Sequence, residues 1–146
     1  MPVRTAEARW QGALQDGSGT MRVGSGAFEG RYSFASRMEN GTGTNPEELI
    51  GAAEAGCFSM AFANALSQAG HQPQEISTKA NVQFEKLEKG WTISRIELVT
   101  EGIVPGADEA SFQRIAEEAK KTCPVSRALT GSQISLKATL KSGVRA

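Results

Sequence analysis

The sequence is poor in the residues that metal sites and many hydrolytic sites require. It contains one histidine, His71, and two cysteines, Cys57 and Cys123. No cysteine and histidine cluster has the spacing of a zinc site, so a structural metal site is not expected. No other cofactor is expected either. A serine or cysteine nucleophile with a histidine base would have to use His71. This residue follows the predicted end of a helix, and such a position is typical of a solvated side chain.

An excess of charge is also missing. Lys and Arg total 16, Asp and Glu total 16, and the sequence contains no basic block, so nucleic acid and anionic membrane surfaces are not expected partners. The N-terminal residues lack the apolar core of a secretory signal. The most apolar stretch, residues 49–66, contains Glu54 and Asn64 and consists mostly of small residues. We therefore predict a soluble, cytoplasmic protein in which this stretch is a buried helix, not a membrane span.

Two cysteines in a reducing compartment allow two interpretations. A structural disulfide does not usually persist there, so a paired use of Cys57 and Cys123 would be transient and redox-active. Alternatively, the two thiols are separate and inert, because unpaired cysteine is among the most buried residue types. Counting alone favours the second interpretation, and only the surroundings of each cysteine can change that.

The first third of the chain is predicted to form a β-meander. Strands are expected at residues 8–11, 20–23 and 27–34. The glycine-containing turns Asp16–Gly19 and Ser25-Gly26 separate them. A polar stretch from Arg37 to Thr44 then leads, as a loop, to the first long helix.

The start of that helix carries strong local signals. Asn45 can cap it, and Glu48 stands three residues later as the partner of a capping box. The helix is predicted to run to Ala69, with Gly70 as its stop signal. Its many small residues allow close approach of another element. We expect a central, tightly packed helix, and Cys57 lies on it.

The second half is predicted to hold two strands, a helix and a last strand. The expected elements are strands 76–87 and 91–103, a helix that begins at Asp108 or Ser111 and ends before Cys123, and strand 133–140. The whole order is β-β-β-α-β-β-α-β, which defines an α+β class. Neither an internal repeat nor a linker interrupts the sequence, so one domain over residues 1–146 is expected.

Two motifs surround the cysteines. The first runs from Gly43 to Ala53 with its Asn-Pro-Glu helix start, and continues at Gly56–Met60; the second is Cys123–Ser126. Together they resemble the motifs of the OsmC/Ohr family of hydroperoxide-reducing proteins. The resemblance extends over essentially the whole chain, from Trp10 to Leu140. Arg37, shortly before the first motif, matches the position of the active-site arginine in the OsmC branch, so the sequence is more similar to that branch than to the Ohr branch.

The resemblance implies a function and a set of site residues. It implies a thiol-dependent peroxidase that reduces organic hydroperoxides in defence against oxidative stress. Cys57 would be the peroxidatic thiol, and Cys123 would be the resolving thiol that closes a disulfide with it. Arg37 and Glu47 would be the pair that positions and polarises the thiolate and the peroxide. The family fold also implies an intertwined homodimer. The regenerating partner would be a dithiol reductant, for which a lipoyl protein is one candidate.

The chemistry explains why an arginine is needed. A thiol with the ordinary pKa of about 8.5 is roughly 3% ionised at pH 7, so full ionisation gains only about thirtyfold in rate. Further acceleration must come from stabilising charge on the leaving oxygen, which the fixed cation of Arg37 can do while it holds Glu47. Phe34 and Met38 flank Arg37, and small or apolar residues surround Cys57. Such a pocket favours organic hydroperoxides over hydrogen peroxide.

Two questions stay open at the level of the sequence. Glu47 and Cys57 are ten residues apart, roughly 15 Å along a straight helix. They can share a site only if the helix breaks near Gly51 or if the two residues come from different subunits. The second question is activity itself, because a peroxide-responsive redox sensor or a non-catalytic dimeric binding module could use the same fold.

Overall fold

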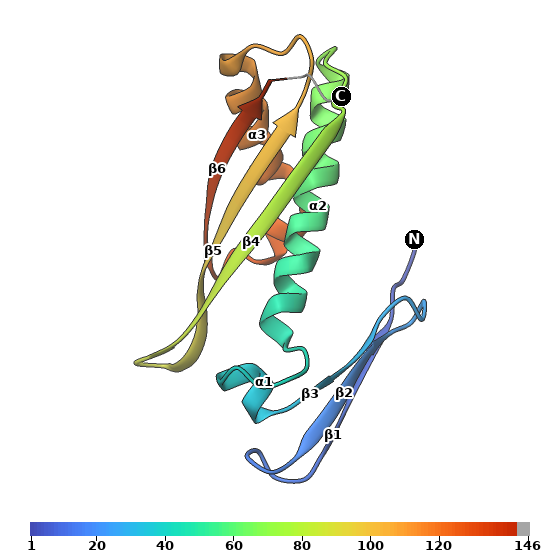
Figure 1. Cartoon of the computed structure of the whole chain (residues 1–146), viewed down its shortest axis with the longest axis vertical. Helices are drawn as coiled ribbons and strands as arrows, with labels where there is room; N and C mark the ends of the chain where they lie inside the picture. Colours follow the sequence, from blue (N-terminus) through green and yellow to red (C-terminus); the bar gives the residue numbers. More distant parts are fainter. Residues whose placement is uncertain (143–146) are drawn as a thin grey trace. The chain divides into compact units, whose positions relative to one another are not determined.

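The computed structural model describes residues 1–142 and has the predicted α+β class, with two three-stranded sheets (Figure 1). In chain order the elements are β1 (Ala6–Gln11), β2 (Ser18–Val23), β3 (Glu29–Tyr32), α1 (Phe34–Met38), α2 (Pro46–Gln68), β4 (Glu75–Leu87), β5 (Gly90–Ile103), α3 (Glu109–Thr122), α4 (Pro124–Ala128) and β6 (Gln133–Lys141). The predicted order of the long elements is therefore confirmed. The two short helices, α1 and α4, are additional.

The chain divides into two compact units, Met1–Leu49 and the residues from Ile50 onward. The expectation of a single domain over residues 1–146 stays a prediction, and its last four residues lie outside the described part of the chain.

The first unit contains the antiparallel meander β1-β2-β3. Its strands pair from Ala6 opposite Val23 to Gln11 opposite Ser18. Gly19 in β2 is required by close packing, because a Cβ there would lie 2.6 Å from the Tyr32 ring. This allows the rings of Trp10 and Tyr32 to approach to 5.3 Å on one face of the meander.

Helix α1 corrects two expectations for this unit. Phe34 was expected in a strand and Arg37 in a loop, but both lie on α1. The reason is a reciprocal cap: the Ser33 side chain accepts from the Ser36 N–H, and the Ser36 side chain accepts from the Ser33 N–H. A capping box normally has Glu or Gln in the second role, so the Ser-x-x-Ser pattern gave a weaker signal.

The start of α2 follows the sequence signals with one change. The Asn45 side chain accepts a hydrogen bond from the Glu48 N–H at 2.8 Å, as a cap should. The Glu48 carboxylate, however, accepts from the Thr44 hydroxyl at 2.6 Å. The predicted cap at Asn45 is thus present, while the Glu48 side chain bonds to Thr44 and does not complete the capping box with the Asn45 N–H.

The end of α2 is a Schellman motif. Gly70 has φ +90°, which a residue with a side chain adopts only at a cost. The Gly70 N–H donates to the Ser67 carbonyl at 3.0 Å and the His71 N–H donates to the Leu66 carbonyl at 2.9 Å. The helix therefore ends at Gln68, one residue before the predicted Ala69.

The second unit is built on the sheet β4-β5-β6. Strands β4 and β5 form a long antiparallel hairpin, and β6 pairs parallel to β5. The hairpin closes where Leu87 pairs with Gly90, whose φ of +116° suits the tight turn. Figure 1 shows α2 running beside β4.

Helices α2 and α3 pack over the same face of this sheet. The rings of Phe62 on α2 and Phe112 on α3 are 5.0 Å apart, and both side chains are fully buried. Ile96 and Leu98 of β5 belong to the same core. The core residues are Phe58, Phe62, Leu66, Ile96, Leu98, Val104, Phe112, Ile115, Ala116, Ala119 and Cys123.

Only a narrow stripe of α2 is buried within the chain. Phe58, Phe62 and Leu66 are buried at successive turns, whereas Met60 is 77% exposed. By length and composition alone α2 could also cross a membrane, and 28% of its most apolar stretch is buried. The predicted buried helix is therefore buried on one side only in a single chain.

Candidate active site

Two thiols lie next to each other in the second unit. Cys57 is on α2 and partly buried, and Cys123 is fully buried. Neither is in a disulfide, and their sulfur atoms are 2.9 Å apart. This contact removes the interpretation of two separate buried thiols.

The backbone around Cys123 explains its placement. Cys123 ends α3, where its N–H donates to the Ala119 carbonyl, and it is also the N-cap residue of α4. Pro124 is the first residue of α4, a position where its missing N–H costs nothing. The chain therefore turns at Cys123, and this turn directs the thiol toward α2.

A buried carboxylate completes the cluster. Glu54 is fully buried and precedes Cys57 by three residues, so the two share one face of α2. Its Oε1 accepts from the Ser126 hydroxyl at 2.5 Å and from the Cys123 thiol at 3.6 Å. Its Oε2 has no hydrogen-bond partner among residues 1–142.

Sequence reasoning missed Glu54 as a site residue and used it only to argue against a membrane span. The available signal was a carboxylate within a run of small apolar residues, one turn before a cysteine. The sequence could not show that α4 returns to this turn of α2. Ser126, within the Cys-Pro motif, was likewise given no role.

The surroundings of Cys57 oppose ionisation. Burial, followed by the contact with the Cys123 thiol, raises the pKa of Cys57, and the negative charge of Glu54 adds to this. A backbone hydrogen bond from Val125 acts in the opposite direction and lowers the pKa. The unit therefore brings the two sulfurs together, but the surroundings that it supplies lower the thiolate fraction of Cys57.

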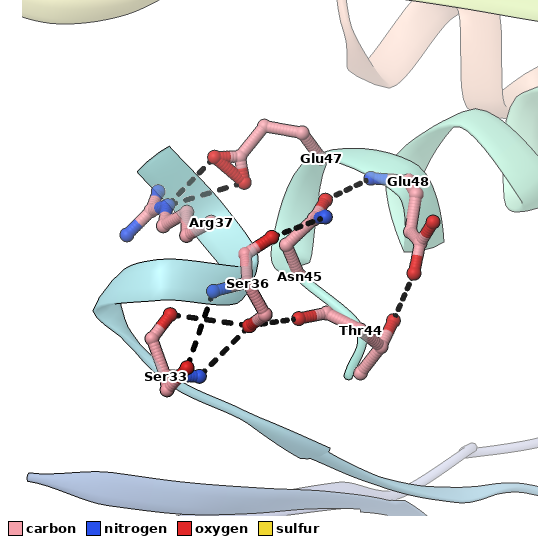
Figure 2. A network of polar contacts seen from close by, with 7 residues as sticks. All are labelled: Ser33, Ser36, Arg37, Thr44, Asn45, Glu47 and Glu48. Atoms are coloured by element: carbon pink, nitrogen blue, oxygen red, sulfur yellow. Dashed lines mark hydrogen bonds and ion pairs between the residues drawn. The ribbon is translucent and has the colours of Figure 1, made fainter. Parts of the chain in front are cut away.

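Arg37 and Glu47 form an ion pair in the first unit, as Figure 2 shows. The Arg37 Nε is 2.6 Å from one carboxylate oxygen of Glu47 and 3.2 Å from the other. Glu47 is buried, whereas the Arg37 side chain is 39% exposed. The predicted pairing of these two residues is therefore present in the structure.

A polar network holds the ends of α1 and α2 together (Figure 2). The Ser36 hydroxyl donates to the Thr44 carbonyl at 2.7 Å, and the Asn45 amide donates to the Ser36 carbonyl at 3.1 Å. Ser36 adjoins Arg37 in α1, and Asn45 directly precedes α2. The network thus fixes the helix turns from which Arg37 and Glu47 extend.

A hollow of about 270 Å³ opens beside Arg37 in the first unit. Phe34 and Met38, which were expected to flank Arg37, both line it. The remaining lining residues are Trp10, Leu14, Tyr32 and Ser33. Arg37 therefore borders a mostly apolar surface large enough for a small organic molecule.

The structure decides one of the two open geometric possibilities. Helix α2 is continuous from Pro46 to Gln68, so the alternative with a break near Gly51 is wrong. Glu47 and Cys57 are therefore ten residues apart on one uninterrupted helix. Among residues 1–142, no group of three or more His, Cys, Asp or Glu side chains is arranged to hold a metal ion.

These features define a class: a small α+β protein in which a cysteine on a central helix faces a second thiol. The chain belongs to the OsmC-like protein family, whose model matches residues 39–138. The predicted OsmC/Ohr membership is confirmed.

Individual relatives agree with this assignment. The chain is 44% identical over 140 residues to Peroxiredoxin OsmC of Escherichia coli K12, which covers 95% of this chain and 97% of that protein. It is 36% identical over 93 residues to an organic hydroperoxide resistance protein of Xanthomonas axonopodis pv. citri, covering 63% of each. The solved structure of the organic hydroperoxide resistance protein OhrB of Bacillus subtilis matches with a TM-score of 0.70 at 25% identity, over 94% of this chain and 98% of that chain.

Proposed function

We propose that this protein is a thiol-dependent peroxidase that reduces organic hydroperoxides and so contributes to defence against oxidative stress. The observation that carries the proposal is the pair of unbonded thiols, Cys57 and Cys123, with sulfurs 2.9 Å apart. Relatives named as a peroxiredoxin and as organic hydroperoxide resistance proteins support the same reaction class.

The reaction would proceed in two steps. The Cys57 thiolate attacks one peroxide oxygen, the O–O bond breaks, and the alcohol leaves after taking up a proton. Cys57 is then a sulfenic acid, which the Cys123 thiol converts to a disulfide with release of water. A dithiol reductant, for which a lipoyl protein is a candidate, would restore both thiols. A cytoplasmic location fits this cycle because the reduced state is maintained there.

Arg37 and Glu47 are proposed to act at Cys57 of a partner subunit in a homodimer. Within one chain, Glu47 is ten residues from Cys57 on a continuous helix, and burial raises the pKa of the Cys57 thiol. A cation supplied by the partner would offset both the burial and the charge of Glu54. The exposed apolar side of α2, which includes Met60, is a surface that a second copy could cover.

The substrate class follows from the hollow beside Arg37. Its lining of Trp10, Leu14, Tyr32, Phe34 and Met38 is mostly apolar. Each CH₂ group buried there is worth about 0.8 kcal/mol, close to fourfold in affinity. Alkyl and aryl hydroperoxides should therefore react faster than hydrogen peroxide, which gains nothing from this surface.

The test is a titration of reduced protein with one equivalent of cumene hydroperoxide. Wild-type protein should lose two thiols, turn over when a dithiol is added, and react more slowly with hydrogen peroxide. Cys57→Ser should consume no peroxide. Cys123→Ser should react once and leave a sulfenic acid on residue 57 that a dimedone-type probe traps.

Other outcomes identify the rival functions. A protein that loses no thiols is a binding module. One that forms the disulfide but does not turn over with any dithiol is a sensor. Trapping of the probe on Cys123 in the Cys57→Ser variant would reverse the assigned roles of the two cysteines.

A further inference from the structure

Glu54 is a buried acid to which the proposed peroxide cleavage gives no role. It is fully buried, and a carboxylate in such a place is costly unless it is well paired. Its Oε1 accepts two hydrogen bonds, from Ser126 and from Cys123, while Oε2 has no partner among the described residues. A carboxylate kept in this state at a reacting thiol requires an explanation.

The second step of the proposed cycle requires a proton transfer at the same thiol. Cys123 must lose its proton to attack the sulfenic acid, and the hydroxide displaced from Cys57 must gain one. Cys123 is fully buried, so bulk water is a poor base for it. The Cys123 thiol already donates to Glu54 Oε1 at 3.6 Å and lies 2.9 Å from the Cys57 sulfur.

We infer that Glu54 is the general base and acid of disulfide formation. Glu54 takes the proton from Cys123 as its sulfur bonds to the Cys57 sulfur and the S–O bond of the sulfenic acid breaks. The proton then passes to the departing hydroxide, so water leaves and Glu54 is again a carboxylate. No oxidant beyond the peroxide already consumed is needed. This inference rests on the proposed function.

The two oxygens of Glu54 suit this exchange. Oε1 lies 3.6 Å from the sulfur of the thiol whose proton must be removed, and Ser126 fixes the position of Oε1. Oε2, without a partner among residues 1–142, is the atom available to pass a proton on. The charge of Glu54 also raises the pKa of Cys57, so this residue hinders the first step while serving the second.

The competing explanation is purely structural. Through Ser126, Glu54 attaches α4 to α2 and could act only by keeping Cys123 in place. The two explanations predict different rates of disulfide formation when a neutral side chain of the same size replaces Glu54. Glutamine keeps the size and an accepting oxygen but cannot take up a proton, whereas aspartate keeps the base and shortens the reach.

The experiment follows a single turnover of full-length protein with cumene hydroperoxide and separates the two steps. Peroxide loss reports attack by Cys57, and quenched samples analysed by mass spectrometry report sulfenic acid and disulfide. In Glu54→Gln, attack should be within a fewfold of wild type or faster. Disulfide formation should slow by about 100-fold, the usual scale of a lost general base, and sulfenic acid should accumulate on Cys57.

Three further variants make the result decisive. Glu54→Asp should recover part of the rate of disulfide formation. Ser59→Ala removes a different polar contact of α2, the 2.7 Å hydrogen bond to Thr78. This variant should form the disulfide at the wild-type rate. Ser126→Ala removes the contact to α4 but keeps the carboxylate, so it should slow disulfide formation far less than Glu54→Gln does.

The inference is overturned if Glu54→Gln forms the disulfide as fast as wild type. It is equally overturned if Ser126→Ala is as slow as Glu54→Gln, because anchoring would then explain the effect. Failure of the peroxidase proposal is a separate result: wild-type protein would then consume no peroxide, whatever residue stands at position 54.

Discussion

The two thiols differ in exposure and in backbone setting, although their sulfurs are in contact. Cys57 is partly exposed on a long helix, whereas Cys123 is fully buried at the junction of two helices. In the proposed cycle a peroxide from solvent would reach Cys57, and Cys123 would meet the sulfenic acid formed there. The residues that would promote the first step, Arg37 and Glu47, form their own ion pair in the other unit.

Arg37 should increase the rate of peroxide attack by more than its effect on the ionisation of Cys57 can explain. Arg37→Ala is expected to slow peroxide attack by more than the roughly thirtyfold that complete ionisation of an ordinary thiol can supply, because charge on the leaving oxygen is also stabilised. Arg37→Lys should recover only part, since an ammonium cannot hold a carboxylate and face a thiolate in the same geometry. Stopped-flow measurement of peroxide loss checks both. A near-normal rate in the alanine variant would make Arg37 a surface cation.

The pH dependence of thiol alkylation provides an independent measure of the same charge. Burial raises the pKa of Cys57 in the isolated chain, so its thiolate fraction lies below that of an ordinary cysteine and grows with rising pH. In Arg37→Ala, iodoacetamide should therefore label Cys57 along a curve displaced to higher pH than in wild type. Both proteins should also carry Cys123→Ser, so that Cys57 is the one thiol that iodoacetamide can label. Coincident curves would show that Arg37 does not act on the thiol.

At the scale of elements, local signals determined how much could be predicted. The limits of α2 were found within one residue because Asn45 and Gly70 each impose a specific backbone geometry. Helix α1 was missed because its cap uses a pair of serines. The role of Glu54 depends on α4 returning to α2 from more than 60 residues away, and no local pattern encodes that return.

Gly70 provides a test of the helix stop. Gly70→Ala should lower the free energy of unfolding by about 1 kcal/mol, because alanine is strained at the positive φ of this position. Gly131→Ala is the matched control, since a Cβ there meets nothing within 4 Å and the residue has no positive φ. Urea unfolding followed by circular dichroism measures both variants. Equal stability of the two would mean that the stop at Gly70 tolerates a side chain.

At the scale of the whole molecule, Glu47 and Cys57 stand ten residues apart on the continuous helix α2, and this motivates the proposed homodimer. Neither unit alone holds both the ion pair and the two thiols. If the proposed homodimer forms, each site draws its thiols from one copy and its ion pair from the other. Two sites of this kind are related by a two-fold axis, as the symmetry of a closed dimer requires.

Mixed dimers test this arrangement directly. Cys57→Ser should be inactive and Arg37→Ala should be strongly slowed, yet unfolding and refolding them together should restore activity. With random assortment about half of the dimers are hybrids, each with one intact site, so about a quarter of wild-type activity is expected. The control is refolding of each variant alone. If the mixture stays inactive although hybrids are detected by native mass spectrometry, Arg37 and Cys57 of the same chain cooperate.

The short distance between the two sulfurs has a consequence for survival under high peroxide. A sulfenic acid that meets a second peroxide molecule becomes a sulfinic acid, which ordinary thiols cannot reduce. Here the competing thiol is already 2.9 Å away, so disulfide closure does not depend on concentration, whereas damage does. At a given oxidant concentration the proposed enzyme should therefore lose fewer molecules per cycle than one whose second thiol must first approach, and the fraction lost should rise with the oxidant. Its tolerated dose would be set by how quickly proton transfer lets the disulfide close.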